Sequence, residues 1–407
     1  MKETRFKQTE IGLIPEDWEI LSVGKDCTVK ARIGWQGLTT SEYMLHGKYG
    51  LITSTDIVNG KINWSSCFFV SKFRYEQDKN IIIKAGDILI SKDGTIGKVG
   101  IVSEIPFPAT LNSGVFVVRS KNQQLQYATA LAFISPYFKD FIKRLTAGST
   151  IIHLYQKDIV KFTYPVPKCI EEQNKIASAL TTIDNLLLSL DKLIEKKRLI
   201  KQGAMQELLT GKKRLPGFTG EWVEKKLGEG LRFKPGFPFN SNFFDERMGI
   251  RLIRNRDLKA DDQITYFYGN INKDFIIENG DLLIGMDGDF MPCLWNKGKA
   301  LLNQRVGKIE LISNNWCLMY LFYALQEPLK AKQEKTGATT VKHLSHSDIE
   351  QMRLKMPSTS IEQKVIGKIL SSMDKGIESL EGKKAKYEQI KQGMMQQLLT
   401  GKIRLIS

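Results

Sequence analysis

The sequence predicts a mixed α/β protein built from two similar domains, each followed by a long amphipathic helix. The first observation is a repeat, because IKQGAMQELLTGKKRL (200–215) returns as IKQGMMQQLLTGKIRL (390–405). The second is that short apolar runs separated by Gly, Asn and Asp, typical of strands and turns, precede each copy. The third is that apolar residues then recur at alternating spacings of four and three, typical of helices that pair.

The repeat covers most of the chain. The offset between matching residues is 204 at Trp18 and Trp222 and falls to 190 at His153 and His343, after which it holds without a gap. Loop insertions and deletions in a duplicated domain produce such a drift. We therefore divide the chain into two domains and two helical regions, which are 1–168, 169–212, 213–358 and 359–407.

Within each domain the expected elements follow the same order. Strands are predicted at apolar runs such as 81–83, 88–90 and 115–118. A helical segment is predicted after them, at 127–145 in the first copy and 316–335 in the second. This gives two α/β domains of ordinary size.

The two helical regions carry the apolar pattern of paired helices. Its positions are Ile176, Leu180, Ile183, Leu187, Leu190 and Ile194 in the first, and Ile366, Leu370, Met373, Ile377 and Leu380 in the second. We expect the helices to pair with each other, although each could instead pack on its own domain. Each would run on the order of 60 Å at 1.5 Å per residue.

Glycines mark two levels of each helix. Gly211 and Gly401 follow LLT in both copies, where a left-handed C-terminal cap is expected. Gly203 and Gly393 lie inside the helices, although an interior glycine costs roughly 1 kcal/mol relative to alanine. Their presence in both copies predicts a close backbone approach or a bend at that level, unless it reflects drift.

The charge balance favours a polyanionic partner. With 60 Lys and Arg against 44 Asp and Glu, the formal net charge is +16, which makes nucleic acid the leading candidate and leaves improved solubility as the alternative. The five cysteines form no CxxC pair, so neither a disulfide framework nor a zinc knuckle is expected, and reduced cytosol fits best. No signal peptide or membrane span is expected, because the longest apolar run (316–325) is about half the required length.

Catalytic motifs are not found. GTIGKVG (94–100) lacks the spacing and the hydroxyl of a phosphate-binding loop, and the four histidines lack metal-ligand spacing. His153 and His343 occupy equivalent positions, which favours a structural role. Neither an [ND]PP[YF] motif nor a glycine-rich cofactor loop for methyl transfer is present, and the ExK at 224–226 has no convincing acidic partner. The chain is expected to be non-catalytic, with no cofactor and no metal.

A basic, non-catalytic protein with two related domains predicts a DNA-recognition module. Base-reading residues are expected where polar residues differ between the copies inside a shared frame. These candidates are Ser54, Thr55, Lys92 and Ser113 in the first copy and Arg254, Asn255, Arg256, Gln304 and Arg305 in the second. A further exposed loop is predicted at Arg32, Trp35 and Gln36, answered by Lys234 in the second copy. Arg suits guanine and Asn or Gln suits adenine, but any of these could be an ordinary solvated loop residue, and Trp35 could be core.

The motifs GDILISKDG, LN, GSTIIHL, VPKCIEEQNKI and LLTGK, in duplicated order, resemble those of DNA specificity subunits of type I restriction–modification systems. The resemblance covers essentially the whole chain, with the family's usual proline pair before EQ reduced to VPKCIEEQ and MPSTSIEQ. It implies two target recognition domains at opposite ends of an antiparallel helix pair with pseudo-twofold symmetry. Each domain would read one half of a bipartite, asymmetric site in double-stranded DNA, and the helices would set the spacing.

The resemblance also implies partners. Two methyltransferase subunits that bind S-adenosylmethionine would dock on the helical regions, and a restriction and translocase subunit would add cleavage. The residues assigned to the spacer and docking helices are Ile183, Leu187, Leu190, Gly203, Met373, Ile377, Leu380 and Gly393. Three alternatives remain open: the specificity subunit of a related bifunctional enzyme, a stand-alone DNA-modifying enzyme, and a coiled-coil scaffold that binds only proteins.

Overall fold

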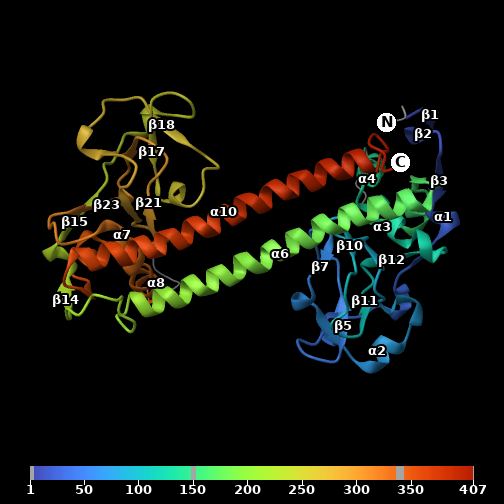
Figure 1. Cartoon of the computed structure of the whole chain (residues 1–407), viewed down its shortest axis with the longest axis horizontal. Helices are drawn as coiled ribbons and strands as arrows, with labels where there is room; N and C mark the ends of the chain where they lie inside the picture. Colours follow the sequence, from blue (N-terminus) through green and yellow to red (C-terminus); the bar gives the residue numbers. More distant parts are fainter. Residues whose placement is uncertain (1–3, 148–152, 336–342, 407) are drawn as a thin grey trace. The chain divides into compact units, whose positions relative to one another are not determined.

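The computed structural model describes residues 4–147, 153–335 and 343–406. It divides into two compact units: unit 1 is Met1–Ser189 with Lys384–Ser407, and unit 2 is Leu190–Lys383. Each unit contains one mixed α/β domain and parts of both long helices (Figure 1). The mixed α/β class, the two similar domains and the two long helices are therefore confirmed.

A four-stranded antiparallel sheet of order β10-β9-β12-β4 forms the centre of the unit 1 domain. Its strands are β4 (Cys27–Lys30), β9 (Ile88–Ser91), β10 (Val99–Ile101) and β12 (Val115–Ser120). A smaller sheet contains β5 (Tyr49–Ile52), β8 (Phe68–Val70) and β11 (Ala109–Leu111), with β11 parallel to β5. The remaining strand pairs are β3 (Trp18–Ser22) with β13 (Thr163–Pro167), β1 (Phe6–Thr9) with β2 (Gly12–Pro15), and β6 (Ile57–Val58) with β7 (Lys61–Ile62).

The central sheet is buried on both faces, which explains why its strands are continuously apolar. Side chains alternate along a strand, so Ile88 and Ile90 of β9 join the core beside the helices, whereas Leu89 joins the core beside the smaller sheet. Phe116 and Val117 of β12 divide in the same way. The unit 1 domain is thus a layer of helices, a central sheet and a smaller sheet.

Unit 2 repeats this plan. Its central sheet contains β15 (Leu231–Pro235), β23 (Val306–Leu311), β20 (Leu282–Gly285) and β21 (Pro292–Leu294) in that order. Its second sheet contains β16 (Phe244–Asp245), β18 (Thr265–Phe267), β17 (Ile250–Ile253), β22 (Ala300–Leu302) and β19 (Ile276–Ile277), with β17 parallel to β22. β14 (Trp222–Lys226) pairs with β24 (Arg353–Pro357), as β3 pairs with β13 in unit 1. Short helices are α1 (Val23–Asp26), α2 (Lys72–Glu76) and α5 (Gln156–Ile159) in unit 1, and α9 (His346–Glu350) in unit 2.

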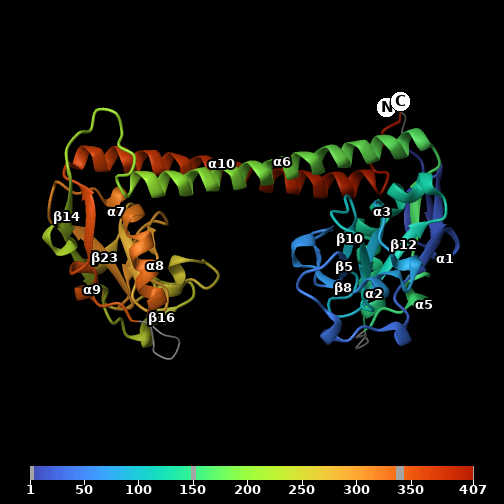
Figure 2. The same cartoon turned by 90° about the horizontal axis from the view of Figure 1, so that it is seen from below.

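The helical segment predicted in each domain is divided into two helices. Unit 1 has α3 (Gln126–Ile134) and α4 (Pro136–Thr146), and unit 2 has α7 (Leu318–Ala324) and α8 (Gln326–Lys335). The break in unit 1 follows from Pro136, which occupies the first position of α4 and has no backbone N–H to continue α3. Figure 2 shows that the domain of each unit, taken by itself, lies on one side of its helix pair.

The long helices are α6 (Ile170–Leu208) and α10 (Ser360–Leu398), with 39 residues each. In unit 1, Ile176 and Leu180 of α6 share a core with Leu398 and Met394 of α10. In unit 2, Leu208 of α6 shares a core with the α10 residues Ile366 and Leu370. Of the predicted pairing residues, Ile183, Leu187, Leu190, Ile194 and Ile377 are buried, and Met373 and Leu380 are partly buried.

Ion pairs show that the helices run antiparallel within each unit. In unit 1, Lys391 lies 2.6 Å from Asp184, whereas Arg404 beyond α10 reaches back to Glu172 near the start of α6. Unit 2 contains the equivalent pairs, shifted by 190 residues: Lys201 with Asp374, and Arg214 with Glu362. The repeated ends of the helices therefore dock on repeated partners. Gly211 and Gly401 adopt φ of 71° and 68°, which confirms the predicted left-handed conformation.

The close approach predicted at Gly203 and Gly393 is wrong. A Cβ atom added at either position would have no atom within 4 Å, and both residues lie on exposed helix surface. α6 and α10 continue through them. These glycines are therefore not required by packing inside the chain.

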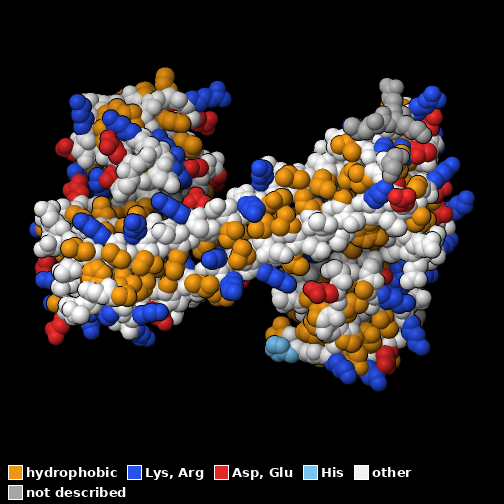
Figure 3. Space-filling model, in the orientation of Figure 1, with side chains coloured by type: hydrophobic (Ala, Val, Ile, Leu, Met, Phe, Trp, Pro, Cys, Tyr) orange, Lys and Arg blue, Asp and Glu red, His pale blue; other side chains and the backbone are white. Residues whose placement is uncertain are grey.

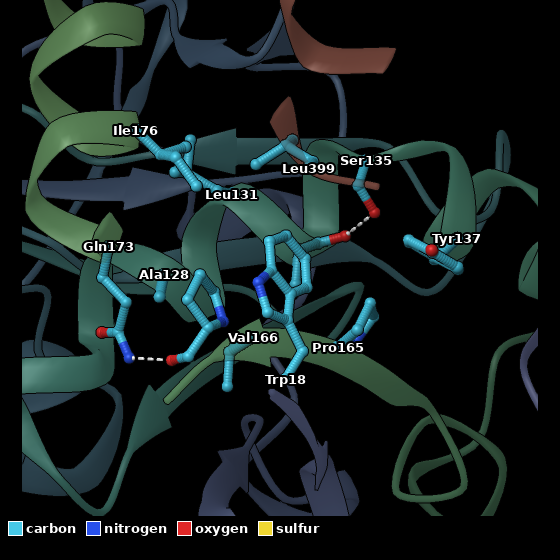
Figure 4. Close-up of a pocket in the computed structure, with 12 residues that line it drawn as sticks. Trp18, Ala128, Leu131, Ser135, Tyr137, Pro165, Val166, Gln173, Ile176 and Leu399 are labelled. Atoms are coloured by element: carbon cyan, nitrogen blue, oxygen red, sulfur yellow. Dashed lines mark hydrogen bonds between the residues drawn. The ribbon is translucent and has the colours of Figure 1, made fainter. Parts of the chain in front are cut away.

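A small cavity of about 30 Å³ lies where the unit 1 domain joins its helices (Figure 4). Trp18 of β3, Gln173 of α6 and Leu399 after α10 are among its lining residues. Gln173 Nε2 donates to the Pro167 carbonyl at 2.6 Å, which links α6 to β13. The equivalent Gln363 donates to the Pro357 carbonyl at 3.0 Å in unit 2. Each domain is thus fastened to the start of the helix that follows it by the same amide.

Candidate nucleic-acid interface

The loops after β5 and β17 each contain a buried aspartate, at equivalent positions of the repeat, that shapes the loop. Asp56 is 1% exposed, and its carboxylate accepts hydrogen bonds from the N–H and the hydroxyl of Thr53, both at 2.8 Å. Asp257 is 2% exposed and accepts from the N–H of Arg254 at 2.9 Å. Because this carboxylate fixes the loop backbone, the neighbouring side chains can differ; they are Ser54 and Thr55 in unit 1 and Asn255 and Arg256 in unit 2.

Three loops of unit 2 meet at Asp287, just after β20. Arg305, in the turn after β22, is 55% exposed, and its Nε lies 3.2 Å from Asp287 Oδ2. Asn255, after β17, donates its side-chain amide to the Asp287 carbonyl. Gln304 beside Arg305 is exposed. The structure therefore brings together candidate residues that lie up to 50 positions apart in the sequence.

In unit 1 the turn after β11 lies close to Asp93, after β9, and carries smaller side chains than its counterpart in unit 2. Asn112 Oδ1 accepts from the N–H of Gly114 at 2.8 Å and shapes the turn after β11. A Cβ at Gly114 would lie 3.1 Å from Asp93 Oδ2, so this turn meets the same aspartate as its counterpart. Ser113 replaces Gln304, and Lys92 is partly buried with its Nζ 5.1 Å from the centroid of the Phe116 ring. The equivalent loops thus carry hydroxyl groups in unit 1 and guanidinium or amide groups in unit 2.

The candidate cations of unit 2 differ in how strongly the protein already holds them. Arg254 donates to Asp257 at 3.2 Å and to the Gln263 carbonyl at 2.9 Å, and its side chain is only 26% exposed. Lys234 lies 3.6 Å from Glu310 and over the ring of Phe275. Arg256 and Arg305 are about half exposed, at 49% and 55%. By exposure, these two arginines are better placed than Arg254 and Lys234 to reach a ligand.

The prediction that the loop at residues 32–36 is exposed is wrong for Arg32 and Gln36. Arg32 is 2% exposed, and its guanidinium donates to the Leu111 carbonyl at 2.8 Å and to Thr110 Oγ1 at 3.2 Å. Burial lowers the pKa of this guanidinium. Gln36 is 6% exposed. Both amino acids are common on surfaces, but here their polar atoms face the interior; the side chain of Trp35 lies outside what the structure describes.

The two equivalent histidines pair with these same aspartates, a contact that was not predicted from the sequence. His153 Nδ1 lies 2.6 Å from Asp93 Oδ1, and His343 Nδ1 lies 2.8 Å from Asp287 Oδ1. The repeat contained a signal, because both members of the pair recur in both copies. Their separation of 60 and 56 residues hid the contact.

Two negative findings concern the described part of the chain. No group of three or more His, Cys, Asp or Glu residues there is arranged to hold a metal ion. Among the helices of the described ranges, none has the length and apolar character of a membrane span.

The chain matches known proteins along nearly its whole length. The family model for the type I restriction modification DNA specificity domain matches residues 15–201 and again residues 219–389. The type I restriction enzyme MjaVIII specificity subunit of Methanocaldococcus jannaschii is 27% identical, over 99% of this chain and 97% of that protein. The EcoBI specificity subunit of Escherichia coli is 35% identical over 172 residues, which are 42% of this chain and 35% of that protein.

A solved structure supports the fold independently. The crystal structure of the S subunit of the type I restriction–modification system from M. genitalium superposes with a TM-score of 0.60 at 17% sequence identity, covering 94% of this chain and 96% of that one. At this identity the likeness concerns the fold alone. The two matches to the family model cover most of the 407 residues and coincide with the two repeats seen in the sequence. The chain therefore belongs to the family of DNA specificity subunits of type I restriction–modification systems.

Proposed function

We propose that this chain is the non-catalytic subunit that selects the DNA site of a type I restriction–modification complex, and that each domain reads one half of a bipartite, asymmetric site. The observation that supports this most directly is that the turns beside Asp93 and Asp287 have equivalent positions in the two domains but carry different side chains. Hydroxyls in one domain and an arginine with an amide in the other prefer different base edges. The net charge of +16 supplies the attraction to the phosphate backbone that both half-sites need.

The long helices would set the distance between the half-sites. Half-sites about one turn of DNA apart, on the order of 34 Å, can be read from one side of a duplex. A helix of 39 residues extends for about 58 Å at 1.5 Å per residue, which is sufficient for such a role.

We assign the docking of two methyltransferase subunits to an exposed apolar spot that occurs once in each unit. Ile200 and Ile390 are equivalent in the repeat and are 47% and 40% exposed, and an open glycine, Gly203 or Gly393, follows three residues later. Orange apolar side chains are visible on the solvent face of the long helices in each unit (Figure 3). In this proposal the methyltransferase subunits bind S-adenosylmethionine and methylate adenine, and a restriction subunit adds translocation and cleavage.

Exchange of one domain tests the proposed function. The segment between Trp18 and Pro167 can be replaced by its counterpart from another specificity subunit, because β3 and β13 pair at these residues and close the domain. We expect only one half of the methylated motif to change when the variant is expressed with its methyltransferase and the methylation is mapped on single DNA molecules. A change in both halves, or in neither, would contradict independent reading by two domains.

Alanine at the open glycines tests the docking assignment. Gly203→Ala and Gly393→Ala are each expected to stabilise the isolated chain by roughly 0.5–1 kcal/mol, since the added methyl meets nothing within 4 Å. We expect the same variants to bind the methyltransferase subunits more weakly, measured by titration calorimetry of the purified components. Gly376→Ala is the matched control, because Gly376 is equally open on α10 but is leucine in the other copy. Equal binding by all three variants would remove Gly203 and Gly393 from the docking surface.

A further inference from the structure

The histidine–aspartate pair is a polar contact outside the long helices that recurs in both domains. Asp93 follows β9 and Asp287 follows β20, and each forms an isolated backbone bridge with its histidine, His153 or His343. The side-chain contacts are 2.6 Å and 2.8 Å. The histidine side chains are 51% and 49% exposed. Two domains that differ in their exposed loop residues thus keep one half-exposed imidazole in the same setting.

The chemistry of the pair determines what the imidazole offers to a ligand. An ionised carboxylate only accepts hydrogen bonds, so Nδ1 of each histidine carries the hydrogen that is donated to the aspartate. The ring is then held in one orientation, and Nε2 is the nitrogen that this bond does not use. Backbone hydrogen bonds of 2.8 Å, from Leu154 to Lys92 and from Leu344 to Met286, already fasten the same segments together. Fastening the loop therefore does not by itself require the imidazole.

Each aspartate has one neighbour that is the same in both domains, the histidine, and one that differs between them. In unit 2, Asp287 contacts His343 through Oδ1 and Arg305 through Oδ2. In unit 1, glycine replaces the arginine and Asp93 keeps the histidine. An acidic side chain on a surface that meets DNA is repelled by phosphate. Its presence there is favourable only when it orients a group that DNA attracts. Orienting the histidine is the task that both aspartates share.

We propose that His153 and His343 each bind a backbone phosphate of their own half-site through Nε2, with Asp93 and Asp287 as positioning residues. This inference rests on the proposed function, because it assumes that both domains meet DNA. A contact that reads a base is expected to change between domains with different targets, whereas a phosphate contact is not, since every sequence presents the same phosphates. A phosphate only accepts hydrogen bonds, so Nε2 donates and the bound imidazole carries the positive charge. Arg305 remains the variable group that distinguishes the second domain.

Salt dependence of binding is the decisive measurement. The full chain, assembled with its methyltransferase subunits, is titrated with a duplex that carries the motif methylated in cells expressing that complex. Compared with the unmodified protein, His343→Gln is expected to reduce the slope of log K against log salt by about one. Across a fourfold rise in salt, the loss of affinity is then about fourfold smaller in this variant than in the unmodified protein. His343→Arg restores the slope, because it returns a cation to the same loop.

Base selectivity and matched histidines provide the controls. Single base changes in the half-site should weaken binding by the same factor in His343→Gln as in the unmodified protein, and the methylated motif should stay the same. His346→Gln changes another exposed histidine of the same domain and should leave the slope unaltered. His153→Gln and His46→Gln are the equivalent variant and control in unit 1. If one of the two variants, His343→Gln or His153→Gln, fails to fold, the salt slope of the other still tests the proposal.

The possible outcomes distinguish a failure of the phosphate contact from a failure of the proposed function. An unchanged slope in both His343→Gln and His153→Gln, with selective binding by the unmodified complex, overturns the phosphate contact and leaves the proposed function standing. A changed base preference in these variants also overturns it, because the imidazole would then read a base. If the unmodified complex shows no preference for its own motif, the proposed function itself fails.

Discussion

Replacing Arg404 with methionine is expected to lower the free energy of unfolding of unit 1 by about 3–5 kcal/mol, the usual cost of removing one partner from a buried ion pair. The reason is Glu172, which is 0% exposed and accepts from Arg404 Nε at 2.6 Å and from Nη2 at 2.8 Å. These hydrogen bonds to Glu172 raise the pKa of Arg404. Without the guanidinium, a buried carboxylate is left without its charge partner. Denaturant unfolding followed by circular dichroism measures the loss, with hydrogen exchange near Glu172 assigning it to unit 1.

Two further variants make this prediction specific. Arg198→Met removes a pair with Glu381 that is exposed on both sides, at 56% and 44%, and should cost no more than about 1 kcal/mol. Adding Glu172→Gln to Arg404→Met removes the uncompensated charge and should recover part of the stability. If Arg404→Met were no more destabilising than Arg198→Met, the buried pair would not be a major stabilising contact.

Low pH should weaken the ion pair that Arg404 forms with Asp17, its more exposed partner. Hydrogen bonds from Arg404 lower the pKa of Asp17 below its ordinary value of 3.8. The stabilisation from Asp17 is therefore fully present above that value and is lost as the pH falls from it through the lower pKa of the folded protein.

Replacing Arg305 with alanine is expected to relax base selection in the second half-site alone. A bidentate contact from arginine to guanine contributes about 1–3 kcal/mol of discrimination, and the half-exposed guanidinium of Arg305 has one carboxylate contact, to Asp287. Mapping of methylated sites on single DNA molecules should show added bases at one position of the second half and no change in the first half.

Arg254→Ala provides the comparison for Arg305→Ala. Its guanidinium is shared between Asp257 and the Gln263 carbonyl, so its loss should loosen the loop after β17 and affect stability as well as selectivity. An unchanged methylation pattern in both variants would remove both arginines from the reading surface. A change in the first half-site would contradict the assignment of one domain to each half.

The sequence predicted the features that depend on periodicity and repetition. The alternating spacing from Ile176 to Ile194 identified a helix whose apolar face is buried, and the repeat located both domains. Burial of polar residues was not predictable in the same way. Arg32 lies in a loop, where arginine is usually solvated, but its guanidinium donates to carbonyl and side-chain oxygens at residues 74, 77, 110 and 111.

The candidate interface was likewise predictable only in part. Its loops could be located because shared residues such as Asp56 and Asp257 flank positions that differ. Which loops meet is set by sheet pairing, since Asp93 and Asp287 reach their histidines across strands that are distant in the chain. The open surface at Gly203 was not predictable, because a helix sequence alone does not show which face is covered.

Unit 2 is continuous in the chain, whereas unit 1 is assembled from residues 1–189 and 384–407. During synthesis on the ribosome, all of unit 2 has been made before Arg404 emerges to meet Glu172. Until then the carboxylate of Glu172 and the apolar surface around Trp18 await their last partners. We therefore expect the first half of the protein to mature later than the second, with contacts of long sequence separation as the slow step.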